Sequence, residues 1–239
     1  MNGEVAEENR RVSALDGLRG LAILFVLLFH TAPGGQAFLP GGFLGVDLFF
    51  VLSGYLITSL LLQEFRRSNH ISLSYFYIRR ALRLFPALAV LLVVVGTYAQ
   101  FRLAEGEQAK VYRGILASIF YYSNWILSRE PAALHMLNHT WSLSIEEQFY
   151  ICFPLCLSFL LLRAVSLRVV AFGLAFMSLV SALLMAFYYV GPEAYNVSYD
   201  RTDSHMAPIL LGALVAVLRM EGKHLHVAGD WGSLAALAL

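Results

Sequence analysis

Residues 15–30 read LDGLRGLAILFVLLFH, an apolar helical run with an aspartate and an arginine near its start and a histidine at its end. At about 100° per residue, Arg19 and His30 fall about 20° apart around a helix, and Asp16 falls about 40° from His30. The three side chains therefore share one face. A rise of about 1.5 Å per residue separates Arg19 from His30 by roughly 16 Å along that face. The pattern predicts a helix that lines a path for a long ligand.

The rest of the chain is equally apolar. Of its 239 residues, 59% are hydrophobic and 14% are charged, and the mean hydropathy is +0.66. Soluble domains usually carry about 25% charged residues. The composition therefore predicts an all-α fold, a polytopic transmembrane helical bundle with the lipid bilayer as its surroundings. The net charge is +1 and the chain has no long basic tract, so the sequence gives no sign of a basic surface that would bind a nucleic acid.

Hydrophobic length and turn residues predict seven spans. They lie at about 16–32, 43–62, 84–101, 111–127, 141–162, 169–190 and 206–219. The first is expected to stop at Pro33, Gly34 and Gly35, and the glycines of the second are expected to pack closely against other helices. The last residues, WGSLAALAL at 231–239, are too few to cross a bilayer. We therefore expect a single membrane domain over 1–239 that continues past its C-terminal end.

Arginines indicate the topology. Arg10 and Arg11 precede the first span and predict a cytoplasmic N-terminus. The basic stretch SYFYIRRALRLF at 74–85 predicts an interfacial helix on the cytoplasmic side, ahead of the third span. The segment 111–127 either crosses the membrane or re-enters it, and the distribution of the later arginines favours re-entry.

Ionisable residues inside spans are candidates for function, because each is costly in lipid unless it is paired or faces a cavity. His30 can serve as a general base near neutral pH, since the unperturbed pKa of histidine is about 6.5. A histidine bonded to a neighbouring helix for packing alone is the alternative. Arg19 and Asp16 on the same face favour function. Asp47 is a further carboxylate near the outer end of the second span, close to its first residue.

Two adjacent carboxylates, Glu146 and Glu147, occur in WSLSIEEQFY at 141–150. Their side chains leave a helix about 100° apart, so that one can face a cavity while the other finds a helix partner. In the alternative interpretation, Ser142 and Ser144 cap the helix, and Ser144 forms a capping box with Glu147.

Three clustered arginines, Arg79, Arg80 and Arg83, can bind phosphates, since guanidinium groups match phosphate oxygens. Anchoring to anionic headgroups is an equally good interpretation of this cluster. Arg201, with Asp203 and His205 nearby, is either part of a site or simple loop charge. No metal site is expected, because His135 and His139 lack the glutamate of a zinc-hydrolase helix.

Four ordered motifs resemble acyltransferase family 3, the integral membrane acyltransferases that O-acylate bacterial envelope polysaccharides and some antibiotics. They are LDGLRGLAILFVLLFH at 15–30, GVDLFFVLSGYLIT at 45–58, YIRRALRLFP at 77–86 and WSLSIEEQFY at 141–150. The stretch DRTDSHMAPILLGALVA at 200–216 is similar to a later arginine motif of the family. The family domain has about ten spans, so the resemblance implies that this chain is a truncated form of it.

The resemblance also implies an activity. An acyl group, usually acetyl, would pass from cytoplasmic acyl-CoA, a co-substrate and not a bound cofactor, to a hydroxyl of a carbohydrate or related acceptor outside the bacterial inner membrane. His30 matches the family's essential histidine and Arg19 matches its paired arginine. A proton-coupled transporter is the alternative, since transporters also bury ionisable groups, but the inverted repeat common in transporters is not visible here.

The expected mechanism follows from these matches. Arg79, Arg80 and Arg83 gather the phosphates of the coenzyme, and Arg19 guides its pantetheine arm. His30, oriented by Glu146 or Glu147, acts as general base or briefly carries the acyl group. The remaining residues expected to bind substrate or support the site are Asp16, Asp47, Trp141, Ser142 and Arg201. The sequence leaves open the acceptor, the acyl chain length and the oligomeric state.

Overall fold

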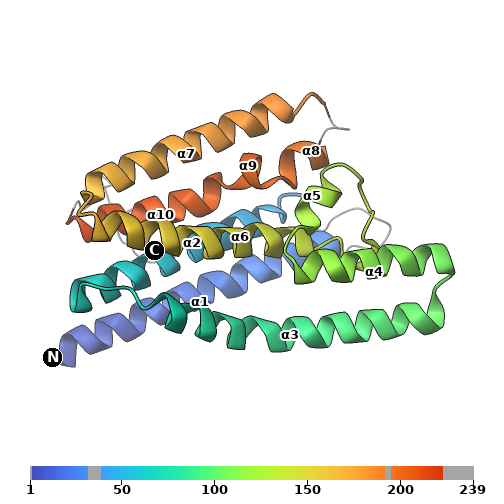
Figure 1. Ribbon diagram of the computed structural model, residues 1–239, viewed down its shortest axis with the longest axis horizontal. Helices are drawn as coiled ribbons and strands as arrows, with labels where there is room; N and C mark the ends of the chain where they lie inside the picture. The colour runs from blue at the N-terminus through green and yellow to red at the C-terminus, as the bar shows by residue number, and fades with distance from the viewer. Residues whose placement is uncertain (1, 32–38, 192–194, 223–239) are drawn as a thin grey trace. The chain divides into compact units, whose positions relative to one another are not determined.

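A computed structural model describes residues 2–31, 39–191 and 195–222, apart from the side chains of residues 2–14, 16 and 195–196. The expected stop at Pro33–Gly35 and the side chain of Asp16 thus lie outside the described residues. Every regular element within those ranges is a helix, which confirms the all-α prediction (Figure 1). In chain order they are α1 (Asn2–His30), α2 (Leu44–Ser68), α3 (Leu73–Arg102), α4 (Glu105–Ile119), α5 (Ser123–Leu127), η2 (His135–Leu137), α6 (Thr140–Leu162), α7 (Leu167–Tyr188), α8 (Tyr195–Tyr199), α9 (Thr202–His205) and α10 (Ala207–Met220).

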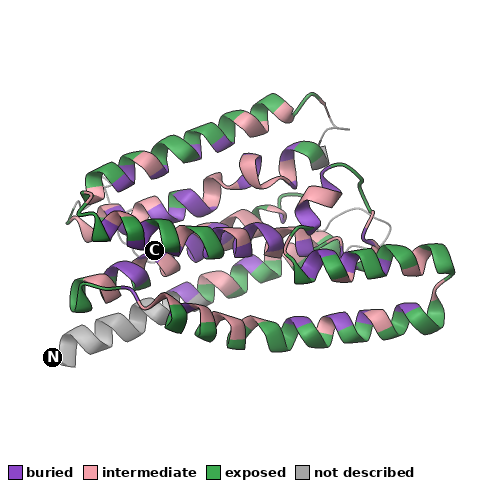
Figure 2. Ribbon diagram, viewed as in Figure 1, coloured by how far each residue is buried: buried purple, intermediate pink, exposed green. Residues whose placement is uncertain are grey.

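Four helices among the described residues are long and apolar enough to cross a membrane, namely α2, α3, α6 and α7. Two shorter apolar helices, Gly17–His30 within α1 and Ala207–Met220, coincide with the first and last predicted spans. Figure 2 shows long exposed stretches along α3 and α7, and many of the exposed side chains there are apolar. An apolar exterior of this kind is what lipid requires, so the prediction of a membrane protein is confirmed.

Helix α3 differs from the prediction of an interfacial helix followed by a separate span. It is one helix of 30 residues, and Pro86 lies inside it. At about 1.5 Å per residue it is roughly 45 Å long, which matches a bilayer including its headgroup regions. The division of this segment into two helices was therefore wrong, because a single proline is tolerated inside a helix of this length.

The segment 111–127 is divided between two helices. Helix α4 ends at Ile119, a turn follows, and α5 begins at Ser123. Tyr121 in the turn has φ of 54°, a left-handed conformation that residues other than glycine rarely adopt. The segment is therefore a broken helix and not one continuous span.

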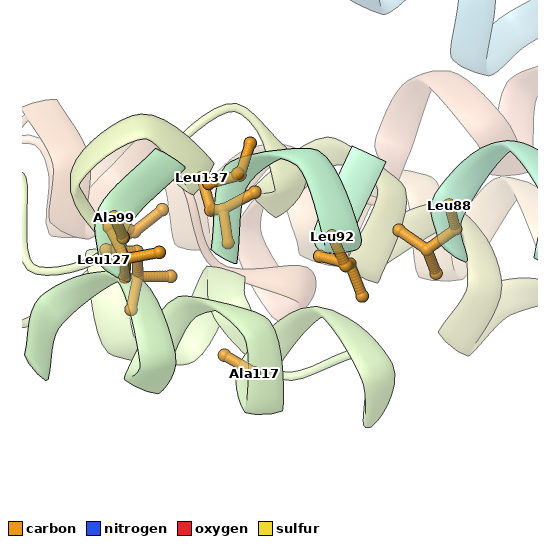
Figure 3. Packing of buried hydrophobic residues seen from close by; sticks show 9 residues of the cluster. Leu88, Leu92, Ala99, Ala117, Leu127 and Leu137 are labelled. Carbon is orange, nitrogen blue, oxygen red and sulfur yellow. The ribbon is translucent and has the colours of Figure 1, made fainter. Parts of the chain in front are cut away.

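The chain forms two compact units, and each is described by itself. The first comprises Met1–Leu62, Leu167–Ala175 and Pro208–Leu239, and the second comprises Gln63–Ser166 and Phe176–Ala207. In the second unit, α3 packs on α4 through a core of buried apolar residues (Figure 3). Those labelled in the figure are Leu88, Leu92, Ala99, Ala117, Leu127 and Leu137.

Glycines bring helices together in the first unit, as the sequence predicted for the second span. A Cβ added at Gly54 of α2 would lie 1.9 Å from the Ile209 carbonyl oxygen of α10. The reverse contact holds for Gly212, whose added Cβ would lie 2.0 Å from the Val51 carbonyl oxygen. At the start of α2, Gly45 approaches the Ala22 carbonyl of α1 in the same way. Only glycine permits such backbone approaches.

Candidate functional site

Helix α6 carries four of the predicted polar residues, Ser142, Ser144, Glu146 and Glu147, and it begins at Thr140. Ser144 therefore lies one turn inside the helix, where its Oγ donates to the Thr140 carbonyl at 3.2 Å and pairs with Ser123 Oγ at 2.7 Å. Ser142 Oγ donates to the His139 carbonyl at 3.3 Å. The capping-box interpretation is wrong, because the helix starts four residues before Ser144.

An ion pair joins the arginine motif of α3 to the glutamate motif of α6. Arg80 donates from Nε to Glu147 Oε1 at 2.9 Å, and its Nη2 donates to the same oxygen. The Glu147 side chain is 7% exposed and that of Arg80 is 21% exposed. The guanidinium carbon also lies 3.2 Å from the centre of the Tyr150 ring, a cation–π contact. Arg80 thus faces inward and meets both a carboxylate and an aromatic face.

Glu146 has a different neighbour from Glu147. The hydroxyl of Tyr150, one turn later on α6, donates to Glu146 Oε1, and both residues are buried. The two adjacent carboxylates therefore point to different surroundings, as their spacing of about 100° on a helix predicts. Tyr150 links them, because its hydroxyl contacts Glu146 while its ring lies against the arginine that holds Glu147.

A cavity of about 190 Å³ lies beside this ion pair. Its walls come from α3, from the turn at Tyr121 and from α6, and its lining is mainly apolar or aromatic. Tyr77 closes part of the wall, since its hydroxyl donates to the Ile151 carbonyl at 2.8 Å. The lining residues are Tyr77, Arg80, Ala81, Leu84, Phe85, Tyr121, Glu147, Tyr150 and Ile151.

The other two clustered arginines do not face this cavity. Arg79 and Arg83 are exposed, and they lie four residues apart on the same side of α3. The guanidinium of Arg79 lies 4.0 Å from the centre of the Tyr75 ring. The structure therefore divides the predicted cluster into an inward Arg80 and an outward pair.

A ring of polar side chains ties α6 to the broken helix and to the start of α9. Gln148 Nε2 donates to the Tyr121 carbonyl at 2.6 Å and to Asn124 Oδ1 at 3.1 Å. Thr202 closes the ring, since its hydroxyl accepts from Asn124 Nδ2 at 2.8 Å and donates to Gln148 Oε1 at 2.5 Å. These bonds hold Tyr121 in its left-handed conformation at the cavity wall.

Arg201 forms a two-point ion pair with Asp203. Its Nε donates to Oδ1 at 2.9 Å and its Nη2 donates to Oδ2 at 2.7 Å. The hydrogen bonds from Arg201 lower the pKa of Asp203, and the same contact raises the pKa of Arg201. The guanidinium lies 5.0 Å from the Trp125 ring centre and 4.5 Å from that of Tyr188. Of the predicted fourth cluster, Arg201 and Asp203 are thus brought together.

His205, the third member of that cluster, is buried in an aromatic group instead. Its Nδ1 bonds to the Tyr199 carbonyl at 2.7 Å, and its ring lies 4.1 Å from that of Tyr199 and 5.4 Å from that of Trp141. Trp141 is thereby placed against the α8–α9 segment. Nearby, burial raises the pKa of Asp200 from 3.8 to about 7, although the charge of His205 opposes this effect.

Arg19, His30 and Asp47 belong to the first unit. Helix α1 is continuous from Asn2 to His30, so Arg19 and His30 lie on one helix as predicted. His30 is exposed in its last turn, and its Nδ1 lies 2.8 Å from the Val26 carbonyl oxygen. The Arg19 guanidinium lies 5.9 Å from the centre of the Phe49 ring of α2. Asp47 is half-buried in the first turn of α2.

Three tyrosines and Gln148 were not predicted as site residues. Tyr150 carried a signal, since it lies four residues after Glu146 on the same helix face. Gln148 stands inside the quoted motif at 141–150. Tyr77 stands in the quoted motif at 77–86, whereas Tyr121 carried no signal, because its position depends on how the broken helix packs against α6.

Comparison with known proteins identifies relatives. A model of the acyltransferase domain family matches residues 12–239. Over 215 residues, 87% of this chain, the sequence is 43% identical to "Putative O-acetyltransferase SACOL0978" of Staphylococcus aureus (strain COL). Over 216 residues it is 39% identical to O-acetyltransferase OatA of Staphylococcus aureus (strain NCTC 8325 / PS 47). Each alignment covers 35% of the relative, so the chain spans about a third of the length of these curated relatives. No solved structure matches.

Proposed function

Because this chain belongs to the acyltransferase domain family, we propose that it transfers an acyl group, in the first place acetyl, to a hydroxyl of a carbohydrate acceptor in the bacterial envelope. In this proposal the donor is cytoplasmic acyl-CoA, and the protein lies in the cytoplasmic membrane with its N-terminus inside. The relatives named as O-acetyltransferases support the reaction class. The four long apolar helices support the membrane setting. The family also favours an enzyme over the proton-coupled transporter.

One observation carries the assignment of His30, namely its hydrogen bond to Val26 at 2.8 Å. A carbonyl oxygen can only accept, so Nδ1 must carry the proton in this bond. In the neutral imidazole, Nε2 then holds a lone pair. Nε2 forms no hydrogen bond with the described residues, and the side chain is exposed. This arrangement supports a role for Nε2 as a proton acceptor or nucleophile.

Two chemical routes use this nitrogen. In the first, the acceptor oxygen bonds to the thioester carbonyl carbon while its proton passes to Nε2, the C–S bond breaks, and the imidazolium returns the proton to the thiolate. In the second, Nε2 attacks the carbonyl carbon, the C–S bond breaks and the coenzyme leaves as the thiolate. The acceptor oxygen then takes the acyl group from the imidazole, and the proton of the acceptor hydroxyl passes to the thiolate, which becomes the thiol.

The coenzyme's phosphates are assigned to Arg79 and Arg83. Both are exposed and lie four residues apart on α3, whereas Arg80 is engaged by Glu147. Guanidinium groups bind phosphate oxygens through paired N–H donors. Arg19 is proposed to guide the pantetheine arm, as its position eleven residues before His30 on α1 suggests.

The experiment is transfer of labelled acetyl from acetyl-CoA to envelope polysaccharide by the full-length protein in proteoliposomes. His30→Ala should lower turnover by about a hundredfold or more, the usual contribution of a positioned general base. His70→Ala is the matched control, since His70 is an exposed histidine in the turn after α2 and should leave turnover unchanged. Wild-type turnover in His30→Ala would contradict the assignment.

A further inference from the structure

We propose that Phe29 and Phe43 are positioning residues for His30, and that together they hold its imidazole ring in the orientation that the acyl transfer uses. This inference rests on the proposed function, because it presupposes that His30 takes part in the reaction. All three residues belong to the first unit, and neither phenylalanine was predicted as a site residue. The contact between α1 and the start of α2 thereby gains a task in the chemistry.

The imidazole of His30 has two contacts that restrict its rotation. Its Nδ1 lies 2.8 Å from the Val26 carbonyl oxygen, one turn earlier on α1. The ring centre of Phe29 lies 5.0 Å from that of the imidazole, with the two planes at 80°, an edge-to-face arrangement that aromatic rings favour. An exposed side chain without such contacts changes rotamer within nanoseconds. The hydrogen bond selects the nitrogen that faces the backbone, and Phe29 limits the angle of the ring.

Phe29 is in turn held by the segment that leads into α2. Its ring centre lies 6.1 Å from that of Phe43, with the planes at 70°, and both side chains are half-buried. Phe43 directly precedes the first residue of α2, and its carbonyl accepts a hydrogen bond from the Val46 N–H at 3.0 Å. Two successive ring contacts therefore link the start of α2 to the histidine.

Gly42 permits this arrangement. A Cβ added there would lie 2.3 Å from the Phe25 carbonyl oxygen and 2.9 Å from the Cβ of Phe29. The backbone beside Phe43 thus lies directly against the last turns of α1, an approach that only a residue without a side chain allows. The close contact of the two backbones keeps the Phe43 ring within reach of Phe29.

The place of His30 in the helix explains why its imidazole needs this support. His30 is the last residue of α1, and helix ends fray more readily than helix interiors. Its side chain is exposed, so it is not enclosed by packing on all sides. A displacement of about 1 Å at a reacting group can lower a rate about a hundredfold. Loss of the Phe29 ring should therefore slow the chemical step and leave binding of the donor unchanged.

Leucine substitutions remove the rings and retain apolar bulk. Phe29→Leu and Phe43→Leu each break one of the two ring contacts, and the double variant removes both rings. Phe25→Leu is the matched control, since Phe25 is half-buried, lies one turn before Phe29 on α1 and makes no ring contact with the described residues. Phe29→Tyr retains the ring and tests rescue. All variants are made in the full-length protein and assayed for transfer of labelled acetyl in proteoliposomes.

Phe29→Leu should lower kcat about tenfold with an unchanged KM for acetyl-CoA, because the donor binds as before while the imidazole is misplaced. Phe43→Leu should lower kcat by a smaller factor. The double variant should be no slower than Phe29→Leu, since Phe43 acts through Phe29. Phe29→Tyr should regain most of the rate lost in Phe29→Leu. Phe25→Leu should keep the wild-type kcat even where its midpoint of thermal unfolding falls. An equal kcat in Phe25→Leu and Phe29→Leu overturns the inference.

A second measurement does not depend on activity. The NMR shifts of the imidazole nitrogens report which of them carries the proton in the neutral ring, and His30→Ala identifies the signals of His30 by their loss. Wild type and Phe25→Leu should show the form with the proton on Nδ1, whereas Phe29→Leu should show a mixture of both forms, because the freed ring leaves the Val26 carbonyl. Wild-type shifts in Phe29→Leu overturn the positioning role. Wild-type turnover in His30→Ala overturns the proposed function of His30 instead, whatever the shifts are.

Discussion

Arg80 places two N–H donors on a single carboxylate oxygen of Glu147, a residue 67 positions later in the chain. This contact joins two sequence motifs that had been assigned separate tasks, phosphate binding and catalysis. It also sets the orientation of the guanidinium at the wall of the cavity. The ion pair thus holds both charged residues of the cavity wall in place.

Removing both partners of this pair should destabilise the protein less than the two single removals added together. Glu147→Ala leaves the Arg80 charge without its carboxylate, which costs about 3 kcal/mol when the group is largely buried. The double variant Arg80→Ala/Glu147→Ala should therefore lose less than the sum of the single variants. Chemical unfolding in detergent measures the coupling. The exposed pair Arg113–Glu130 is the control, and its coupling should be much smaller, because water and salt screen exposed charges. Additive effects at Arg80 and Glu147 would contradict this interpretation.

Close backbone approach should make Gly54 and Gly212 intolerant of alanine. An added Cβ would meet a carbonyl oxygen at 1.9 Å in one case and 2.0 Å in the other, so α2 and α10 would have to separate. Overpacking of this kind costs about 1–3 kcal/mol and occasionally more. Thermal unfolding of Gly54→Ala and Gly212→Ala should show lower midpoints. Gly173→Ala on α7 meets nothing within 4 Å and should be neutral or slightly stabilising. Equal midpoints for all three variants would refute the contact.

Asp200 should make stability depend on pH. Burial raises its pKa from 3.8 to about 7, so between these values the folded protein keeps a proton that the unfolded chain releases. The free energy of unfolding therefore falls as pH rises through this range and levels off above it. Asp200→Asn should remove that contribution and be more stable than wild type at pH 8, by at most about 4 kcal/mol at about 1.4 kcal/mol per pKa unit. Near pH 4 the two proteins should match. A constant difference at all pH values would mean that Asp200 is not the titrating group.

The polar ring at Gln148 should be needed for the broken helix to keep its shape. Gln148→Leu leaves the Tyr121 carbonyl and the Asn124 side chain without this partner, which costs about 1–3 kcal/mol for each buried group left unsatisfied. The midpoint of unfolding should fall, and protease cleavage near residues 120–122 should increase. Gln108→Leu removes surface hydrogen bonds to the Gln100 and Leu103 carbonyls and should have a smaller effect. Equal losses in the two variants would show that the ring has no special role.

The sequence predicted correctly those features that depend on short stretches of the chain, such as helix formation and the direction of neighbouring side chains. The hydropathy pattern predicted helices and a membrane setting, and helical periodicity predicted that Glu146 and Glu147 would point to different surroundings. The glycines of the second span predicted a close contact, and Gly54 makes it. The expected spans 141–162, 169–190 and 206–219 agree with α6, α7 and α10 to within two residues. Local signals failed in two places: Ser142 and Ser144 do not cap α6, which starts before them, and α3 continues through Pro86. At these two places tertiary packing outweighs the weak preference of serine for a helix start and of proline for a helix end.

The sequence alone thus determined the helical class, the membrane environment and the family, because apolar length, periodicity and motif order are properties of short stretches. Only the tertiary structure decided which partner each of these residues has. In the structure Arg80 points inward to Glu147, while Arg79 and Arg83 are exposed. Tyr121 lines the same cavity as Arg80 and Glu147. Contacts across tens of residues depend on which helix faces meet and at what register. Hydropathy does not encode that choice, since many packings bury the same apolar area.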